Sequence, residues 1–349
     1  MSEDRPEQID DPTPLQEETS VSPGDSSDRT LILLAALFLM LVAGWLTVKD
    51  PLMRRAAESG QVSVVKLLTL AGADLDGTDR EGQTALGRAA LEGNRDLLQT
   101  LIDSNANING FDVQGITPLA SAVYGGHRDL VKLLLEAGAA VNVKDREGWT
   151  PLMAAALEDN SEIVKALLEA GADLQAQNSW GATTLSIAGF QGNVETVELL
   201  LEMGAEVNAR DIWETTPLMH SHPEVISFML EAGADRDAKD QLGRNALLHA
   251  SRKGLADSVR ILLEVGADFT AQDSAGLTAL MLAAGPGSGE TKFGMGSVQV
   301  EADPVQTAEL LLRAGANYSA ESNEGKTALM YAKENGRENL VALLEVAER

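Results

Sequence analysis

A turn glycine that returns every 33 residues constrains the fold of this chain more than any other feature. Four glycines keep this step without error, Glu214 occupies the next slot, and the series resumes after one short and one long step. The glycines of this ladder are Gly82, Gly115, Gly148, Gly181, Gly243, Gly276 and Gly325. A fixed period in the low thirties indicates a stack of small units, none of which can bury its apolar face alone. Such stacks usually form binding surfaces rather than catalytic pockets.

The stretch 146–178 indicates what one unit folds into. Thr150 and Pro151 follow the turn glycine; a threonine hydroxyl caps a helix N-terminus, and proline fits the first helical position. A short helix with small residues on one face comes next. A second helix has apolar residues three and four positions apart and ends at Gly171-Ala172, where glycine accepts a left-handed backbone. We therefore expect an all-α repeat solenoid of helix-turn-helix units with hairpin-like loops.

This unit resembles the ankyrin repeat, which opens with Asp-x-x-Gly-x-Thr-Pro-Leu-His and closes with Gly-Ala-Asp-Val-Asn. The match is close at Gly148–Leu152 and Gly171–Leu174, and it recurs about nine times over residues 49–349. The short repeat at 212–240 and an insertion near 285–303 break the period. Other residues replace the family histidine, namely Met153, Met219, Leu248, Met281 and Met330. The resemblance implies an array that binds another protein on the concave face and the turn tips.

The N-terminal residues 1–30 are acidic and polar, with nine acids and two bases, and we expect them to be disordered. Residues 31–48 contain no charge, and as a helix they would span ~27 Å, close to the thickness of a bilayer core. An acidic segment before the apolar run is the opposite of what a signal peptide needs, so an uncleaved transmembrane helix is the favoured interpretation. A signal peptide cleaved near Val42-Ala43-Gly44 and a buried core helix are the alternatives.

The basic residues that flank this segment indicate its orientation. Arg29 lies on its N-terminal side, whereas Lys49, Arg54 and Arg55 lie on the other side. The positive-inside bias therefore favours a single-pass membrane protein whose repeat domain is cytoplasmic.

Composition and motifs argue against several other functions. The net charge of −26 repels the phosphates of nucleic acids, and the absence of cysteine excludes disulfides and thiolate chemistry. His220 and His222 form a His-x-His motif without a third ligand, so we expect no metal site and no cofactor. The glycines at 285–296 lack the Gly-Lys-Ser/Thr ending of a phosphate-binding loop, so we interpret that stretch as a flexible insertion. No small-molecule substrate is evident.

Aromatic and apolar residues mark the expected partner-binding surface. Four residues of the first helices lie 33 positions apart and would align into an apolar ridge, namely Leu91, Tyr124, Leu157 and Phe190. The turn tips beside the ridge carry Phe111, Trp149, Trp180 and Trp213. Exposed contiguous aromatics usually mark a recognition surface. Trp149 follows the turn glycine directly, and for it a packing role is the alternative. On the binding interpretation, replacing Trp180 and Phe190 by alanine abolishes partner capture without lowering the melting temperature much.

The short sixth repeat interrupts this ridge, and Arg252 and Lys253 follow in the seventh. Loss of one helical turn predicts a notch between Phe190 and Arg252. Our hypothesis is that a carboxylate of the partner lies against Arg252 and Lys253; a solvated basic pair is the alternative.

These observations favour a membrane-tethered scaffold that binds another, membrane-associated protein. A regulatory subunit of a membrane transporter is an alternative that the sequence does not separate from it. An enzyme that uses the insertion, or a metal site at His220 and His222, is the other alternative.

Overall fold

The computed structural model describes the backbone of residues 26–285 and 302–349, and the side chains within those ranges from residue 40 onward. Residues 1–25 of the segment expected to be disordered, and most of the insertion near 285–303, lie outside the described residues. Residues 26–30 form the start of a helix, so the expectation of disorder is wrong for them. The described chain forms α1 (Ser26–Glu58), α2 (Val62–Leu70), α3 (Ala85–Leu91), α4 (Arg95–Asp103), α5 (Pro118–Tyr124), α6 (Arg128–Glu136), α7 (Pro151–Leu157), α8 (Ser161–Glu169), α9 (Thr184–Gln191), α10 (Val194–Glu202), α11 (Pro217–His220), α12 (Pro223–Glu231), α13 (Ala246–Lys253), α14 (Ala256–Glu264), α15 (Ala279–Ala284), α16 (Pro304–Arg313), α17 (Ala328–Glu334) and α18 (Glu338–Ala347).

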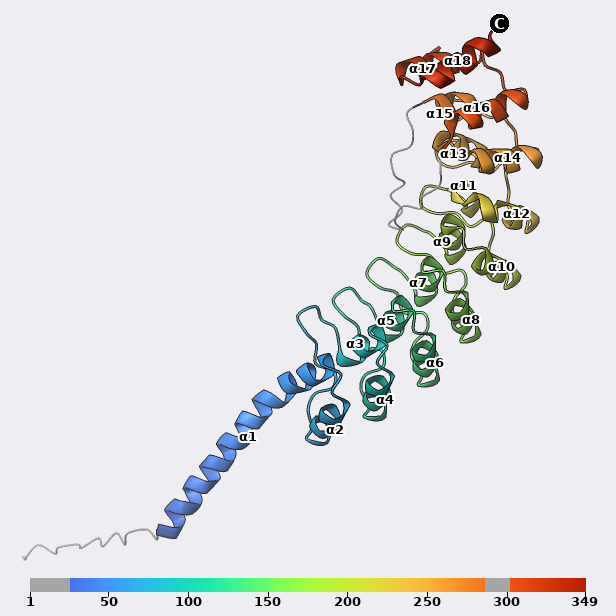
Figure 1. Cartoon of the computed structure of the whole chain (residues 1–349). Coiled ribbons are helices and arrows are strands. Elements are labelled where there is room, and N and C mark those ends of the chain that lie inside the picture. The colour runs from blue at the N-terminus through green and yellow to red at the C-terminus, as the bar shows by residue number, and fades with distance from the viewer. Residues whose placement is uncertain (1–25, 286–301) are drawn as a thin grey trace, which may run out of the picture.

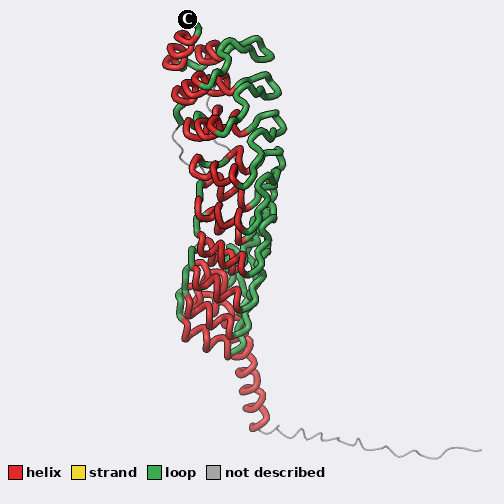
Figure 2. The backbone as a smooth tube through the Cα atoms, turned by 90° about the vertical axis from the view of Figure 1, so that its right-hand side faces the viewer, coloured by secondary structure: helices red, strands yellow, loops and turns green. Residues whose placement is uncertain are grey.

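These helices stack as antiparallel pairs into a curved array, with the odd-numbered helices in one column and the even-numbered helices in the other (Figure 1). Long loops connect each pair to the next and project from one side of the stack (Figure 2). In the described ranges these loops contain isolated β-bridges, such as that between Gln177 and Thr183, and no strand. The expected all-α repeat fold is confirmed.

Threonine caps begin most of the first helices, as the sequence predicts. The hydroxyl of Thr150 accepts a hydrogen bond from the backbone N–H of Met153 at 3.3 Å. The same hydrogen bond forms at the other regular repeats, where the capping residues are Thr84, Thr117, Thr183, Asn245, Thr278 and Thr327. A side-chain acceptor satisfies a backbone donor that a helix start otherwise leaves unpaired, so each repeat fixes the start of its first helix locally.

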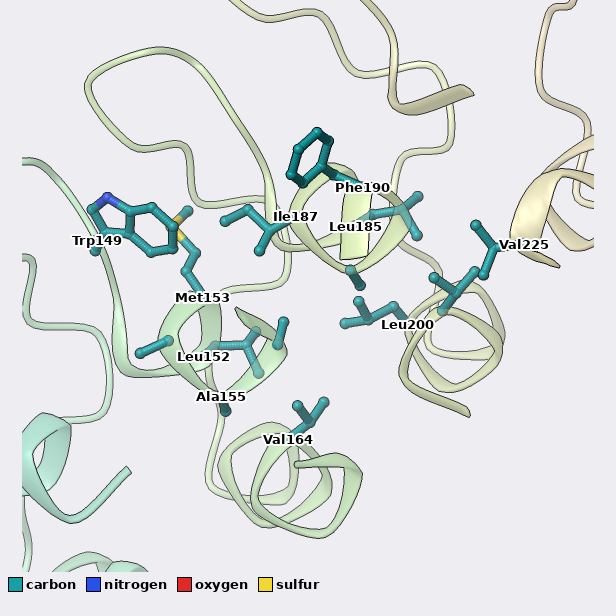
Figure 3. Packing of buried hydrophobic residues seen from close by; sticks show 14 of the residues in the cluster. Trp149, Leu152, Met153, Ala155, Val164, Leu185, Ile187, Phe190, Leu200 and Val225 are labelled. Carbon is teal, nitrogen blue, oxygen red and sulfur yellow. The ribbon is translucent and has the colours of Figure 1, made fainter. Parts of the chain in front are cut away.

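The core lies between the two columns of helices (Figure 3). Small residues at one position of the first helices are buried, as Ala155 and Ala188 show. Apolar residues of the second helices pack against them, including Val164 and Leu200, which are fully buried. Because one repeat supplies only one side of each contact, every pair of helices needs its neighbour to complete the core.

Side-chain amides bridge the turns that follow the C-terminal ends of the second helices. The Asn142 amide donates to the carbonyl of Gly171 at 3.2 Å and accepts from the backbone N–H of Asp173 at 2.8 Å. Gln175 repeats both contacts one unit later, with Gly204 and Glu206. These bridges satisfy backbone groups at the helix ends and connect successive repeats.

The short sixth repeat loses its residues from its first helix, since α11 has only four residues. The chain that follows α11 turns directly onto α9, where the N–H of His222 donates to the carbonyl of Gly189 at 2.8 Å. A Cβ at Gly189 would come within 2.9 Å of the Ser221 hydroxyl and 2.4 Å of the Met229 methyl group. Glycine at position 189 therefore permits the close approach that the missing turn produces.

The first helix, α1, extends away from the end of the array (Figure 1). It continues through Pro51, and its last turns carry Met53, Ala56 and Ala57, which are buried in the core of the first repeat. In the part of the chain whose residues are fully described, no helix is long and apolar enough to cross a membrane. The side chains of residues 31–39, half of the predicted 31–48 segment, lie outside that part.

Candidate functional site

The loops between repeats end in tips that form a hydrogen-bonded ladder. The backbone N–H of Arg146 donates to the carbonyl of Gln114 at 2.9 Å, and the same bond joins Ser179 to Glu147 and Ile212 to Trp180. The ladder continues to Gln241, Ser274 and Asn323. Neighbouring tips are therefore held in a fixed register from one end of the array to the other.

An acidic or amide side chain at the start of each tip shapes its turn. The Oδ1 atom of Asp145 accepts from the backbone N–H groups of Glu147 at 2.9 Å and Trp149 at 2.8 Å. Asp211 makes the same pair of contacts two repeats later. A carboxylate that accepts hydrogen bonds from the backbone of its own turn stabilises that turn, so we assign these acids a structural role.

The structure places the four predicted tip residues in different environments. Phe111 is 65 % exposed and Trp213 is 38 % exposed, whereas Trp180 is half-buried. Trp149 is buried at 6 % and lies beside Met153 (Figure 3). Its predicted role as a partner contact is therefore wrong in this structure, and the packing alternative fits. The physical reason is that a side chain directly after the turn glycine points back onto the first helix of its own repeat.

Three further apolar residues lie exposed at the tips, and sequence reasoning did not identify them. They are Val113, Ile212 and Leu242. Each stands between the acid or amide of its tip and the turn glycine slot, where other repeats carry polar residues such as Glu81 and Glu147. An apolar residue in that short interval is the sequence signal that could have predicted these exposed apolar side chains.

The predicted ridge becomes more buried along the array. Leu91 is 42 % exposed, Tyr124 and Leu157 are half-buried, and Phe190 is only 7 % exposed. The first three residues thus line the surface as expected, whereas Phe190 belongs largely to the core. Phe190 is part of the buried cluster, and the Lys253 ammonium on α13 lies over its ring.

Tyr124 lies among carboxylates. Burial, followed by the charges of Asp145, Glu158 and Glu147, raises the pKa of Tyr124 to about 12. No described base pairs with any of these three acids. The concave surface around α5 and α7 is therefore acidic.

The predicted notch at the sixth repeat is occupied by a lysine. The Lys253 ammonium lies 5.9 Å from the ring centroid of Phe190 and 3.3 Å from Nδ1 of His220. It thus spans the gap that the short α11 leaves between α9 and α13. Arg252, its neighbour, is half-buried at the same edge. The structure brings together Phe190, Arg252 and Lys253, which the sequence had placed on either side of an open notch.

A buried polar network adjoins this lysine, and the sequence did not predict it. Nε2 of His249 donates to Oδ2 of Asp240 at 2.9 Å, and Arg244 approaches the same oxygen at 3.1 Å. Burial opposes ionisation of Asp240, but its hydrogen bonds and these neighbours hold its pKa at about 2. Burial lowers the pKa of His249, and burial together with the charge of Lys253 lowers that of His220 well below its ordinary value. Both rings are therefore neutral at pH 7, and their centroids lie 4.8 Å apart.

A spacing of nine residues is the signal that could have revealed this network. The same spacing joins Asp79 to Arg88, where Nη2 and Oδ2 are 2.6 Å apart, and Ser322 to Tyr331 at 3.1 Å. Each pair connects the base of a loop tip to the first helix of the same repeat. Because nine is neither a helical nor a strand period within one element, periodicity alone does not predict these contacts.

The two histidines of the His-x-His motif lie in different surroundings. His220 faces Lys253 and His249, whereas the ring of His222 packs against Gly192, where an added Cβ would come within 2.7 Å of it. Among the residues whose side chains are described, no group of three histidines and acids could hold a metal ion. A cavity between Thr183 and His220 measures about 20 Å³, room for roughly one water.

Comparison with known proteins identifies one family. A family model described as ankyrin repeats (three copies) matches residues 52–145, 138–211 and 213–291, which is more than half of the chain. No curated protein matches the chain significantly.

Proposed function

The chain belongs to the ankyrin repeat family, and from this premise we propose that it is a membrane-tethered scaffold that binds a partner protein on its loop tips and concave surface. Ankyrin repeats generally bind other proteins, and the family is typically not enzymatic. The tethering, the membrane association of the partner and the surface used are parts of our proposal.

The exposed apolar side chains at the loop tips carry this proposal. Phe111 and Val113 form one group, and Ile212, Trp213 and Leu242 form another on adjacent tips. Backbone hydrogen bonds join the tips of the second group, since the N–H of Gln241 donates to the carbonyl of Trp213 at 3.1 Å. Apolar groups held in a fixed register lose little conformational freedom on binding, which favours a protein interface.

Site-specific photo-crosslinking tests the surface. A photoreactive phenylalanine analogue replaces Ile212 in one full-length variant and Phe111 in another. Met203, which is exposed at the far end of α10, is the matched control. We expect crosslinks to one common protein from the two tip positions and none from position 203. Crosslinks to that protein from position 203 alone would refute the surface assignment.

The proposed anchor rests on the uncharged segment 31–48. The part of it with described side chains carries exposed apolar residues, including Met40, Leu41 and Leu46, where α1 extends away from the array. Apolar side chains on a projecting helix are costly in water, and insertion into a bilayer would remove that cost. We place the repeat domain on the cytoplasmic side, following the bias of basic residues after position 48.

Alkaline carbonate extraction of membranes tests the anchor. We expect the full chain to stay in the membrane pellet and a variant without residues 31–48 to move to the supernatant. Release of the full chain by carbonate would exclude a spanning anchor. Protease treatment of intact cells, with a tag at the C-terminus, tests the orientation: the tag should survive until the membrane is permeabilised.

A further inference from the structure

Three cationic side chains gather at the short repeat of this acidic chain. Arg244, Arg252 and Lys253 lie close enough to His220 for their charges to lower its pKa. Arg244 pairs with Asp240, as described above. In the described residues, no carboxylate lies within ion-pair distance of Arg252 or Lys253. The edge between α11 and α13 therefore holds an excess of positive charge on a chain whose net charge is −26.

The described residues leave the two cations without an anionic partner. Nε of Arg252 is buried, and no described residue hydrogen-bonds to it. The Lys253 ammonium contacts a ring face and a neutral imidazole, and burial, followed by the charge of Arg252, lowers its pKa to about 8. Two desolvated cations side by side destabilise each other, and a carboxylate between them would stabilise both.

The opposite charge excess lies toward the other end of the concave surface. Asp145, Glu147 and Glu158 surround Tyr124 on α5. Asp159 adds a fourth carboxylate near Glu195, and burial together with the charge of Glu195 raises its pKa. Leu157 is half-buried on α7, directly before Glu158 and Asp159. The surface from α5 to α13 thus has acidic residues with an apolar side chain beside them at one end and basic residues at the other.

We propose that this surface binds an extended segment of a partner protein that is itself dipolar, with a Lys or Arg over the carboxylates around Tyr124 and an Asp or Glu side chain between Arg252 and Lys253. The inference rests on the proposed protein-binding function and specifies the partner. Apolar residues of the segment pack on Leu157. A side-chain carboxylate is the ligand rather than a chain terminus, because α15 and α17 continue the array beyond the basic site and the segment has no reason to end there.

The spacing of the two charges follows from the stack. Packed helices lie 8–10 Å apart, so the four steps from α5 to α13 cover roughly 30–40 Å. An extended chain advances about 3.3 Å per residue, so the basic and acidic residues of the segment should lie roughly 10–12 positions apart.

Selection of peptides against the full chain tests this inference. The probe is a phage-displayed library of random 16-residue peptides. We expect the selected peptides to carry a Lys or Arg and an Asp or Glu about 10–12 positions apart with apolar residues between them, as the geometry above requires. The best peptide is then synthesised with an amidated C-terminus, which should leave its affinity unchanged. Selected peptides without this charge pattern, or an affinity that needs the free C-terminus, would overturn the inference.

A double-mutant cycle adds a second readout. We expect Lys253→Gln with Arg252→Gln to weaken binding of the selected peptide about tenfold or more, the order of one buried charge-assisted hydrogen bond. The same double variant should have little effect on a peptide whose acid is replaced by its amide. Lys132→Gln, on the exposed face of α6, is the matched control and should change neither. Equal losses for both peptides would show that the two cations act on folding rather than on the carboxylate.

Two further outcomes separate the possible failures. Substitution of Glu290 and Glu301 by glutamine should leave peptide affinity unchanged, and a tenfold increase would mean that the chain's own carboxylate takes the site, which would overturn the assignment to a partner. If selected peptides crosslink to Ile212 but show no coupling to Lys253, the dipolar segment is refuted and the binding surface remains. Peptides that crosslink only at Met203 would refute both.

Discussion

Replacing the turn glycine at position 148 by alanine should destabilise the array more than replacing the helix-end glycine at position 171. Both residues have a left-handed backbone, with φ of 82° and 86°. A Cβ at Gly148 would lie 2.8 Å from the backbone nitrogen of Ser179 and 3.1 Å from the carbonyl carbon of Asn178, whereas a Cβ at Gly171 meets nothing within 4 Å. Both substitutions therefore place an alanine in a left-handed backbone conformation, but only Gly148→Ala also brings its Cβ too close to the neighbouring loop tip.

The shared cost is the left-handed conformation of a residue with a side chain. It amounts to roughly 1–2 kcal/mol, and about 0.5–1 kcal/mol is recovered because alanine loses less backbone entropy on folding than glycine. Gly171→Ala should therefore lower the free energy of unfolding by about 1 kcal/mol. Gly148→Ala must also push the next tip away, which adds roughly 1–3 kcal/mol for overpacking against backbone. The hydrogen bond from the N–H of Ser179 to Glu147, 2.9 Å long, is the contact that would lengthen.

Urea unfolding followed by tryptophan fluorescence measures the difference, with the unsubstituted chain as reference. Because repeat arrays can unfold in parts, hydrogen exchange at the Ser179 amide gives a local measure beside the global midpoint. We expect a lower midpoint and faster exchange at Ser179 in Gly148→Ala, and unchanged exchange there in Gly171→Ala. Equal midpoints for the two variants would show that the close approach between tips contributes nothing, and our reasoning on the ladder would be wrong.

The other predictions concern the loop tips, the buried Phe190, the buried polar network and Lys253. Ile212→Ser should weaken partner binding without shifting the urea midpoint. Phe190→Ala should lower the free energy of unfolding by about 3 kcal/mol, because it leaves a cavity at a buried site. An unchanged urea midpoint for Phe190→Ala would contradict the burial of this ring. Stability should fall as the pH drops below 6.5, because the unfolded chain protonates His249 before the folded chain does. The contribution of Asp240 should persist until the pH falls through its ordinary pKa of 3.8 toward about 2. Affinity for the selected peptide should decrease as the pH rises through about 8, where Lys253 loses its proton.

The pH predictions have simple controls. His249→Gln should make the urea midpoint less sensitive to pH between 7.5 and 5.5, a range chosen around the ordinary histidine pKa of about 6.5. A midpoint that rises on acidification would reverse the sign that burial of His249 requires. Lys253→Arg keeps the positive charge at all these pH values and should flatten the decline of peptide affinity near pH 8. A decline that persists in Lys253→Arg would assign the titration to another group.

The regular part of the fold was predictable because each repeat encodes it locally. A threonine at the cap and a glycine at the turn act on their own backbone, so Thr150 and Gly148 predict their conformations without knowledge of the neighbours. Trp149, which follows its turn glycine, is buried, whereas Trp180 and Trp213, which precede the turn slot, are half-buried and exposed. That distinction is visible in the sequence once the turn geometry is known.

The site at the sixth repeat was predictable only in part. The sequence located the missing turn and the basic pair, but it predicted an open notch. The structure fills that notch because Lys253 is long enough to reach Phe190 across a four-residue helix. Contacts between repeats that break the period depend on how the chain closes around the break, and a repeat pattern contains no information on that closure.

The continuity of α1 restricts how the repeat array can be oriented relative to the uncharged segment 31–48. No flexible linker separates the uncharged segment from the first repeat, since one helix runs through position 48 and enters the core at Met53. A helical spacer transmits direction, whereas a glycine-serine linker would allow the domain to rotate freely. If residues 31–48 lie in a bilayer, the array stands at a fixed tilt with its tips at a fixed height. Partners would then be selected by their distance from the membrane as well as by their charge.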